Sequence, residues 1–417
     1  MQTAGQGDNG IQPANERFFT PPLLIIFLTI FIDLVGFGIV IPLLTFYGEE
    51  MGATPLDIGL LVSSYSLMQF GFSPIWGALS DRFGRRPILF LTILGTSVGY
   101  LVLGLATSLW MVYAGRLISG IAGGNLATAQ AYIADVTSRE NRARGMGLFG
   151  MAFGLGFIIG PALAGVLSKF GMHVPFIFAS GLSFANAALL YFILPESLSP
   201  DRVGVKREGR LRQMWSSIKN PILAKISLDF FLVVTAFSMM TTAFAYYTMV
   251  KFGYDAEKTG YLLGFVGLVA AVMQGGVFGV LAKRFGEVPL IAVGCVILTA
   301  SLVAVPFVSA ASGGLPMLLI GIAAFAIGNS ISSPALTSLA SKSANEAEQG
   351  QALGIMQSFA SLARVIGPLL CGLLLNNQFN QVDDATILRT FWTAAGIMVA
   401  ALVVSLFLRR VPKEKFS

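Results

Sequence analysis

The amino-acid sequence predicts an all-α membrane protein with twelve transmembrane helices. Of its 417 residues, 55% are hydrophobic and 12% are charged, and the mean hydropathy is +0.76. A soluble domain carries about 25% charged residues, so this composition places the chain in a bilayer. The apolar runs are continuous and rich in Gly, Ala, Leu and Phe, whereas a membrane barrel would show alternating segments of about ten residues. Soluble enzymes, nucleic-acid binders and disulfide scaffolds are thereby disfavoured.

Twelve apolar stretches account for the predicted helices. A spanning helix needs about 20 apolar residues, and each stretch comes close to that length between charges, Gly or Pro. The stretches lie at about 23–46, 57–79, 88–106, 110–133, 145–168, 174–194, 222–250, 259–282, 288–310, 314–340, 349–375 and 386–408.

The distribution of Lys and Arg predicts the orientation. The two tails and the even-numbered connections hold twenty of these cations, whereas the odd-numbered connections hold three, Lys169, Lys251 and Lys258. Because cations gather in cytoplasmic loops, we expect both termini to face the cytoplasm. The first twenty residues lack a basic leader region and a small-residue cleavage site, so we expect no cleaved signal peptide.

The chain divides into two related halves. The predicted parts are a cytoplasmic tail at 1–20, an N-terminal half at 21–194, a cytoplasmic linker at 195–221, a C-terminal half at 222–408 and a second cytoplasmic tail at 409–417. Residues 77–84, Gly-Ala-Leu-Ser-Asp-Arg-Phe-Gly, recur at 279–286 as Gly-Val-Leu-Ala-Lys-Arg-Phe-Gly. Residues 160–165, Gly-Pro-Ala-Leu-Ala-Gly, recur at 367–372 as Gly-Pro-Leu-Leu-Cys-Gly. Parallel repeats of this kind are a transporter architecture, with the site between the repeats near the midplane.

The segment 77–86 forms a short loop between the second and third stretches. Gly77 and Gly84 permit close approach and unusual dihedral angles, and Asp81, Arg82 and Arg85 offer charges that can dock on helix ends. The alternative is that these cations only set the orientation.

This loop resembles the signature loop of the major facilitator superfamily, whose pattern is Gly-x-Leu-Ala-Asp-Arg-x-Gly-Arg-Arg/Lys. The later copy departs at Lys283, where the first has Asp81. The resemblance implies the superfamily's fold of two pseudo-symmetric six-helix halves. It also implies that Asp81 lies near the start of the eleventh helix and that Arg85 pairs with Asp135 at the end of the fourth. Such contacts would lock the cytoplasmic side while the carrier faces outward and would break when it faces inward.

A second motif lies in the fifth stretch. Gly156, Gly160 and Gly165 place small residues along one face, and Pro161 removes a hydrogen bond and bends the helix. The run resembles the antiporter signature Gly-x-x-x-Gly-Pro-x-x-x-Gly of drug/proton exporters, which implies efflux. The alternative is generic packing of small residues.

Two charged residues within the spans are candidates for proton coupling, because a buried charge costs roughly 2.5–3.5 kcal/mol on insertion. Asp33 has apolar neighbours in the first stretch and could take and release a proton. Its spacing to Gly36 and Pro42 also resembles that of the drug/proton antiporters. Arg116 needs an acid, a polar cavity or an anionic ligand, and it resembles the family's helix 4 Arg, which is implicated in coupling. For both residues the alternative is a structural pair.

The roles of two further charged sites within the spans are less specific, because a structural ion pair would explain each of them. Arg364 could face a central cavity or pair with an acid near the cytoplasm. Lys225 and Asp229 are four residues apart, the spacing of an ion pair within a helix, and we expect them to pair.

Polar residues deep in the spans are the predicted substrate contacts. Large aromatic and apolar walls with few fixed polar groups suit an amphiphilic organic substrate. The candidates are Gln69, Asn125, Gln274 and Gln357, with aromatic walls that include Tyr65 and Phe237. No Walker loop, zinc triad or Ser/His/Asp arrangement occurs, so we expect no cofactor, no metal site and no enzymatic activity.

Over most of the chain the order of features resembles that of the tetracycline/proton antiporters. The segments that carry this likeness are 65–69, 80–87, 109–116, 131–135, 153–156 and 195–196. The tetracycline carriers place a His four residues before a Gln in helix 8, whereas this chain has Ala270 before Gln274. They also carry acids within helices 3 and 9, and the corresponding runs here contain none. These departures weaken the case for metal–tetracycline as the substrate.

We therefore expect a monomeric exporter in a bacterial inner membrane that exchanges protons for an amphiphilic small molecule by alternating access. Its partners would be that substrate, protons and the lipid bilayer, with no nucleic acid. One alternative is a sugar or metabolite exporter on the same scaffold. A different class, a transport-silent receptor or lipid-handling scaffold, predicts no substrate-coupled proton flux and no need for Asp33.

Overall fold

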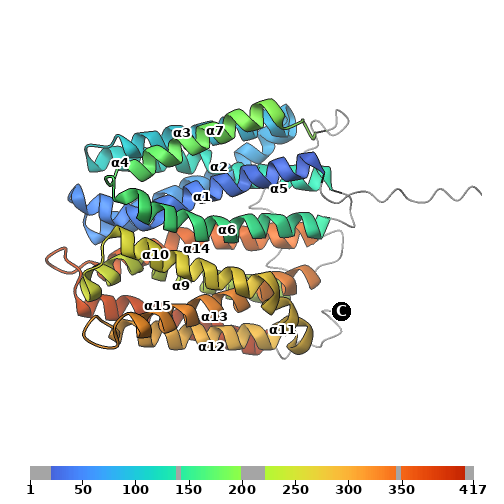
Figure 1. Ribbon diagram of the computed structural model, residues 1–417. Helices are drawn as coiled ribbons and strands as arrows, with labels where there is room; N and C mark the ends of the chain where they lie inside the picture. Colours follow the sequence, from blue (N-terminus) through green and yellow to red (C-terminus); the bar gives the residue numbers. More distant parts are fainter. Residues whose placement is uncertain (1–19, 138–141, 199–220, 344–348, 409–417) are drawn as a thin grey trace, which may run out of the picture.

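The computed structural model describes residues 20–137, 142–198, 221–343 and 349–408, and these are almost entirely helical (Figure 1). The helices are α1 (Pro21–Glu50), α2 (Pro55–Phe83), α3 (Arg85–Gly104), α4 (Leu109–Ala122), α5 (Asn125–Val136), α6 (Arg142–Ser168), α7 (Val174–Ile193), α9 (Pro221–Phe252), α10 (Ala256–Val272), η2 (Met273–Val277), α11 (Phe278–Phe285), α12 (Glu287–Ala304), η3 (Val305–Phe307), α13 (Gly314–Lys342), α14 (Gln349–Leu375) and α15 (Asp384–Leu408). The predicted tails and most of the predicted linker lie outside these residues.

Every predicted stretch falls on a helix or on consecutive helices. Ten helical spans in the described part are long and apolar enough to cross a membrane, and Leu109–Ala122 and Gly154–Ser168 are shorter apolar segments. Two predicted spans are interrupted. The fourth breaks at Gly123 and Gly124 into α4 and α5, and the eighth passes through a π-helical turn, η2, before α11.

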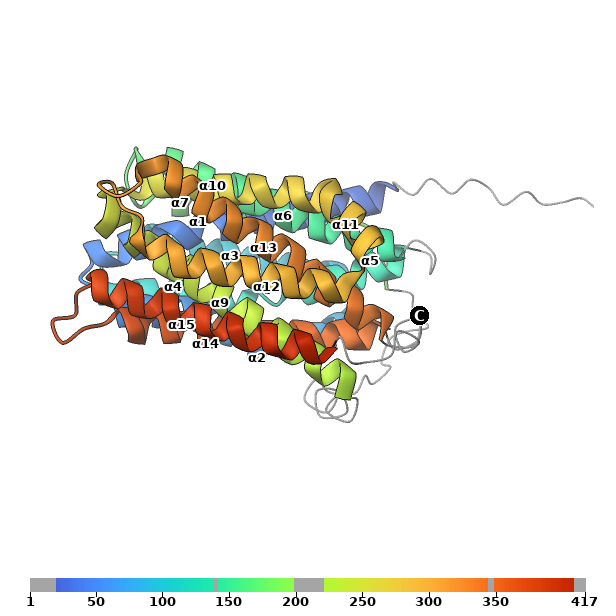
Figure 2. The same ribbon diagram turned by 90° about the horizontal axis from the view of Figure 1, so that it is seen from below.

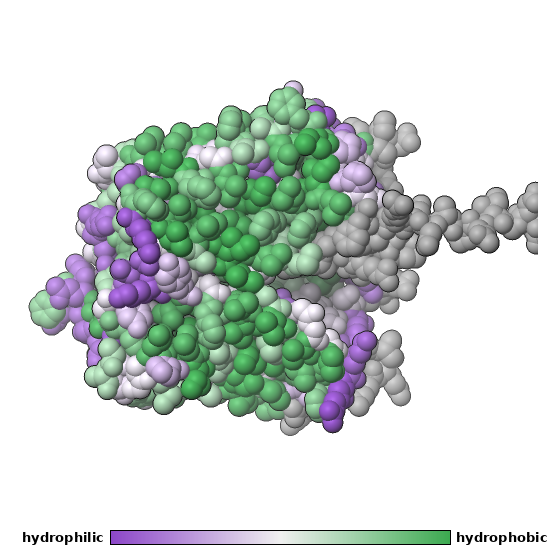
Figure 3. Space-filling view, in the orientation of Figure 1, coloured by the Kyte–Doolittle hydropathy of each residue, from purple (hydrophilic) through white to green (hydrophobic). Residues whose placement is uncertain are grey.

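The helices run roughly along one common direction and form two groups, α1–α7 and α9–α15 (Figures 1 and 2). A broad apolar surface covers the middle of the molecule, and hydrophilic residues gather at its two ends (Figure 3). Such a band suits the hydrocarbon core of a bilayer, which is about 30 Å thick. The chain is therefore a multi-pass integral membrane protein.

We name the two ends by their residues. The arginine-rich face is the end that carries Arg82, Arg85 and Arg86, and the opposite face carries the connections 51–54, 105–108, 253–255 and 308–313.

A pair of tyrosines shows how closely the halves correspond at the opposite face. The hydroxyl of Tyr47 on α1 donates to the carbonyl oxygens of Leu103 and Ala106, at 2.9 and 3.1 Å. The hydroxyl of Tyr247 on α9 donates to those of Val305 and Val308, at 3.0 and 2.8 Å. The two anchors are 200 residues apart in the sequence, which sets the register between α1 and α9.

The halves meet through two crossings of glycine on glycine near the opposite face. A Cβ on Gly260 of α10 would lie 3.0 Å from Cα of Gly165 on α6. A Cβ on Gly59 of α2 would lie 2.9 Å from Cα of Gly372 on α14. Small residues let helix backbones approach this closely, and here they join α6 to α10 and α2 to α14. We call these two contacts the glycine crossings.

Polar contacts reinforce the junction. The Ser63 hydroxyl on α2 donates to the carbonyl oxygen of Val365 on α14 at 2.7 Å. Lys169, just after α6, forms an ion pair with Glu257 on α10 at 2.8 Å. The hydrogen bond between Lys169 and Glu257, together with the charge of Glu257, raises the pKa of Lys169.

The same helices are less crowded toward the arginine-rich face. A Cβ added at Gly77 of α2, Gly279 of α11 or Gly354 of α14 would meet no atom within 4 Å. Gln274 and Gln357 are exposed in this part of the molecule. The described contacts between the halves thus hold the opposite face closed.

Candidate functional site

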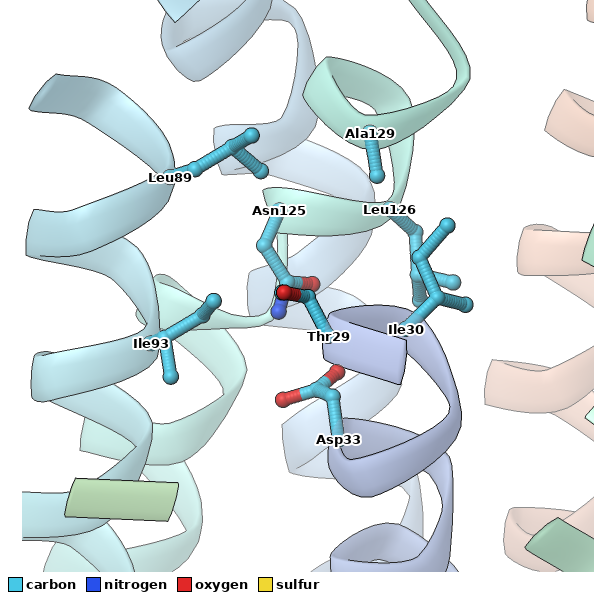
Figure 4. A pocket seen from close by; sticks show the side chains of 8 residues that line it. All are labelled: Thr29, Ile30, Asp33, Leu89, Ile93, Asn125, Leu126 and Ala129. Carbon is cyan, nitrogen blue, oxygen red and sulfur yellow. The ribbon is translucent and has the colours of Figure 1, made fainter. Parts of the chain in front are cut away.

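Asp33 lies at a small cavity of about 10 Å³ in the N-terminal half (Figure 4). The cavity is lined from α1, α3 and α5 by Thr29, Ile30, Asp33, Leu89, Ile93, Asn125, Leu126 and Ala129. Oδ1 of Asp33, Oγ1 of Thr29 and Oδ1 of Asn125 are buried there without a hydrogen-bond partner among the described residues. The volume is close to what one water molecule needs, and the three oxygens could serve one.

The break between α4 and α5 brings Asn125 to this cavity, because Asn125 is the first residue of α5. A broken helix leaves backbone carbonyls without partners within the helix. Side chains from α2 supply the missing donors: Gln69 Nε2 bonds to the Gly123 oxygen at 2.8 Å, and Trp76 Nε1 bonds to the Ile121 oxygen at 2.6 Å.

The four predicted substrate contacts therefore occupy different settings. Gln69 donates to the helix break, and Asn125 faces the Asp33 cavity instead of a space between the halves. Gln274 and Gln357, both in the C-terminal half, are exposed. A substrate role for any of them stays a prediction.

Arg116 is 3% exposed on α4 and has no carboxylate within ion-pair distance among the described residues. Its Nε donates to the Leu61 carbonyl oxygen at 3.1 Å, and its guanidinium lies over the Tyr65 ring, 4.6 Å from the centroid. A backbone carbonyl and an aromatic face thus stabilise the cation, which is an arrangement that sequence reasoning did not consider.

Tyr65 links the charged groups that the sequence singled out. Its hydroxyl lies within electrostatic reach of Asp33, Arg116 and Arg364. Arg364 belongs to α14 in the other half, so Tyr65 stands at the junction of the halves and close to the coupling candidates. In the sequence it was marked by its aromatic character and by its place in the segment 65–69, which resembles the tetracycline carriers.

The signature loop forms the predicted ion pair. Arg85 is 2% exposed, and its Nε lies 3.1 Å from Oδ2 of Asp135 at the end of α5. Its Nη2 lies 2.5 Å from Oδ1 of Asp81, and its Nη1 donates to Ser80 at 2.6 Å. The described contacts of Asp81 are with Arg85, so a position of Asp81 beside the start of α14 stays a prediction. The pair of Arg85 and Asp135 is intact although the opposite face is closed, so the expectation that it breaks when the carrier faces inward is wrong.

Glu196 is a functional candidate that sequence reasoning missed. Its carboxylate accepts the backbone N–H groups of Arg85 and Arg86 at 2.8 and 3.1 Å and so caps the start of α3. A Cβ on Gly84, whose φ is +100°, would lie 2.5 Å from a Glu196 oxygen, so a larger residue has no room there. Glu196 follows α7 in the sequence, and only its place in the segment 195–196, which resembles the tetracycline carriers, could have indicated a role.

Arg82 lies over Phe83 and caps no helix end in the described contacts.

The antiporter motif packs α6 against α1 beside Asp33. A Cβ on Gly156 would lie 2.7 Å from Cβ of Leu34, the residue that follows Asp33. A Cβ on Gly160 would lie 2.7 Å from Cα of Gly38. Further along α6, the Pro161 carbonyl oxygen and Gly165 contact Gly260 across the halves. One helix thus contacts both the Asp33 turn and the closed junction.

The predicted ion pair between Lys225 and Asp229 is wrong. Asp229 is 0% exposed, and neither carboxyl oxygen has a hydrogen-bond partner among the described residues. Lys225 is exposed. Side chains four apart share one helix face only approximately, so α9 turns one into the core and leaves the other outside. Arg364, for its part, donates to Ser361 on its own helix at 3.3 Å.

Comparison with known proteins shows which family the chain belongs to. The family model described as Major Facilitator Superfamily matches residues 26–315 and 275–417. The tetracycline resistance protein, class C, of Escherichia coli is 32% identical over 362 residues, which cover 84% of this chain and 88% of that protein. Multidrug resistance protein 2 of Bacillus subtilis is 31% identical over 398 residues, covering 94% and 95%. A solved bacterial homologue of the human lysosomal transporter Spinster shares the fold, with a TM-score of 0.76, 15% identity and coverage of 95% and 97%. The chain belongs to the Major Facilitator Superfamily.

Proposed function

We propose that the protein exports an amphiphilic small molecule in exchange for protons, with Asp33 as the proton carrier and Arg116 as the group that tunes it. The observation that carries this proposal is the packing of the antiporter motif directly against the Asp33 turn. Because α6 also forms a glycine crossing with α10, a change in the position of the halves reaches the surroundings of Asp33.

The charge arrangement supports proton coupling. Arg116 keeps its charge, whereas Asp33 can be neutral or ionised. The cavity oxygens of Thr29 and Asn125 could hold a water that hydrogen-bonds either form of Asp33. Protonation removes the negative charge near Tyr65 and Arg116, which changes the balance of charge at the junction of the halves.

We assign the arginine-rich face to the cytoplasm of a bacterium, with the protein in the inner membrane as a monomer. In this orientation the glycine crossings close the carrier to the outside. Loss of these crossings would then open the outer side, and new contacts between the signature loop at Asp81 and the start of α14 would close the inner one.

The names of two relatives support the proposed substrate class. Relatives are named for tetracycline resistance and for multidrug resistance, and the second class suits this chain better because Ala270 stands where the tetracycline carriers have a His. Gln274 and Gln357 would meet cargo that enters from the cytoplasmic side.

The test is proton movement in proteoliposomes of the purified protein, with lipophilic cations, tetracyclines and sugars as trial substrates. We expect a lipophilic class to drive proton movement and Asp33→Asn to abolish it. Glu50→Gln, which neutralises an exposed carboxylate on the same helix, is the matched control and should leave coupling unchanged. If Asp33→Asn transports with unchanged coupling, Asp33 is not the carrier.

The same assay separates the alternatives. Stimulation by sugars or polar metabolites alone would favour a metabolite exporter on this scaffold. If no class of substrate moves protons, and Asp33→Asn has no effect, export coupled to protons is wrong.

A further inference from the structure

The C-terminal half contains a buried acid that the proposed mechanism does not use. Asp229 lies on α9 with 0% exposure, and both of its carboxyl oxygens lack a hydrogen-bond partner in the described part of the chain. It lies eight residues from the start of α9, about 12 Å along the helix from the arginine-rich face. An ionised carboxylate in such a place would be strongly disfavoured, so the neutral acid is the stable form here.

The two halves place their buried acids one helical turn apart. The tyrosine anchors set a register of 200 residues between α1 and α9, so that Asp229 corresponds to Thr29 and Val233 corresponds to Asp33. Thr29 lines the same cavity as Asp33. The first helix of each half therefore carries, at a similar depth, a carboxyl with at least one buried oxygen that lacks a partner among the described residues.

The neighbours of Asp229 leave it electrostatically isolated. One titratable group within electrostatic reach is the buried thiol of Cys295 on α12, which is itself hydrogen-bonded to Ser332 of α13. The charged residues of the helices packed on α9 lie elsewhere: Lys342 at the end of α13, Arg364 near Tyr65, and Asp384 and Arg389 at the opposite end of α15. On α1 and α10 the titratable side chains are Asp33, Tyr47, Glu49, Glu50, Glu257, Lys258 and Tyr261. On α9 itself the exposed Lys225 lies one turn nearer the arginine-rich face.

We propose that Asp229 is a second proton-binding site, so that each half of the carrier holds one exchangeable proton. Asp229 is protonated in the conformation described above. When the halves move and water reaches it, the O–H bond breaks, the proton passes to water and the carboxylate remains. On the return step a proton from water forms that bond again. The use of this proton in transport rests on the export proposed above, whereas its binding does not.

The experiment is infrared difference spectroscopy of the purified full-length carrier, stepped between acidic and alkaline pH without substrate. The carbonyl stretch of a protonated carboxyl in an apolar site reports each buried acid directly. We expect one band to disappear in Asp33→Asn, a different one to disappear in Asp229→Asn, and both to disappear in the double variant. Asp384→Asn, at an ion-paired acid that is 73% exposed, is the matched control and should remove neither.

Two outcomes overturn the proposal. In the first, Asp229→Asn shows the same carbonyl bands as the unmodified protein; in the second, the band of Asp229 does not change with pH. If Asp229→Asn fails to fold, Cys295→Ser replaces it, because exchanging the neighbouring thiol should shift the Asp229 band alone. If the unmodified carrier shows a band that depends on Asp229 but none that depends on Asp33, the proposed carrier fails and this inference stands. If it shows a band that depends on Asp33 but none that depends on Asp229, this inference fails and the proposed carrier stands.

In proteoliposomes, Asp229→Asn should then lower the number of protons moved per substrate, while Asp33→Asn abolishes coupling. An unchanged proton count in Asp229→Asn would show that the proton on Asp229 is not used in transport.

Discussion

At equivalent places in the two halves, the ion pairs of the arginine-rich face have opposite polarity. In the N-terminal half the first residue of α3 is the cation Arg85, and its partner at the end of α5 is the acid Asp135. In the C-terminal half the first residue of α12 is the acid Glu287, and its partner at the end of α13 is the cation Lys342. The repeat has therefore kept the contact while exchanging the charges.

The difference matters because helix ends carry partial charges. An acid at a helix start and a cation at a helix end are favourable, so the pair of Glu287 and Lys342 agrees with both helices. Arg85 and Asp135 oppose both helices, and the N-terminal half adds Glu196 as a cap on α3 and Asp81 as a second acid on Arg85. The C-terminal pair has one further partner, Ser338, whose hydroxyl donates to Glu287 at 2.9 Å. The N-terminal cluster depends on several partners and so suits a contact that must rearrange.

Arg85→Gln should have the largest effect on stability, because it leaves Asp81 and Asp135 without the buried cation. Removing one partner of a buried pair costs about 3–5 kcal/mol. Lys342→Gln, in a pair whose cation is 51% exposed, should lose less than about 1 kcal/mol. Thermal unfolding in detergent checks both, and equal losses would contradict the asymmetry of the halves.

Gly160→Ala and Gly367→Ala should have the next largest effect on stability. The added Cβ would lie 2.7 Å from Cα of Gly38 in one half and 2.8 Å from Cβ of Ser238 in the other. Overpacking of this kind costs about 1–3 kcal/mol, so we expect similar losses of stability. Only Gly160→Ala should also impair substrate-driven proton movement, because it displaces α1 near Asp33. Gly154→Ala is the control, because its added Cβ would meet no atom within 4 Å. If Gly367→Ala impairs coupling as much as Gly160→Ala does, α1 has no special role.

Glu196→Ala should cost less, about 0.5–2 kcal/mol, which is the usual range for loss of a helix cap. The carboxylate also accepts the backbone N–H groups of Ser197 and Leu198, at 2.9 and 3.0 Å. The melting temperature, compared with that of Glu50→Gln, reports the loss. An unchanged melting temperature would show that water replaces the cap without penalty.

Glu257→Gln should have the smallest effect, since it breaks an exposed ion pair with Lys169 at the junction of the halves. The pKa of Lys169 is raised by Glu257, so as long as Glu257 is ionised the pair contributes fully below the ordinary lysine value of about 10.4 and is lost as pH rises through the folded value. Distances between spin labels on the two sides of the opposite face should show a slight gain of open carriers. A large gain would mean that this ion pair, and not the glycine crossings, holds the face closed.

Sequence reasoning located the helices and the pair of Arg85 and Asp135, because length, loop charge and a recognised loop determine them. It failed where rotation about a helix axis decides the outcome. Apolar residues surround most of these helices on every side, so the pattern does not show that Asp229 faces the core or that Asn125 faces Asp33. The break between α4 and α5 depends on donors from α2, and the cap by Glu196 depends on a contact 111 residues away in sequence.

The glycine crossings have a consequence for energy conservation. Backbone pressed on backbone leaves no room for a file of water, so the closed end of the carrier insulates the membrane and keeps protons from leaking down their gradient. The crossings involve no side chain that a cargo must recognise. Such a carrier could therefore change the molecules it accepts, residue by residue, while the insulating layer stays intact.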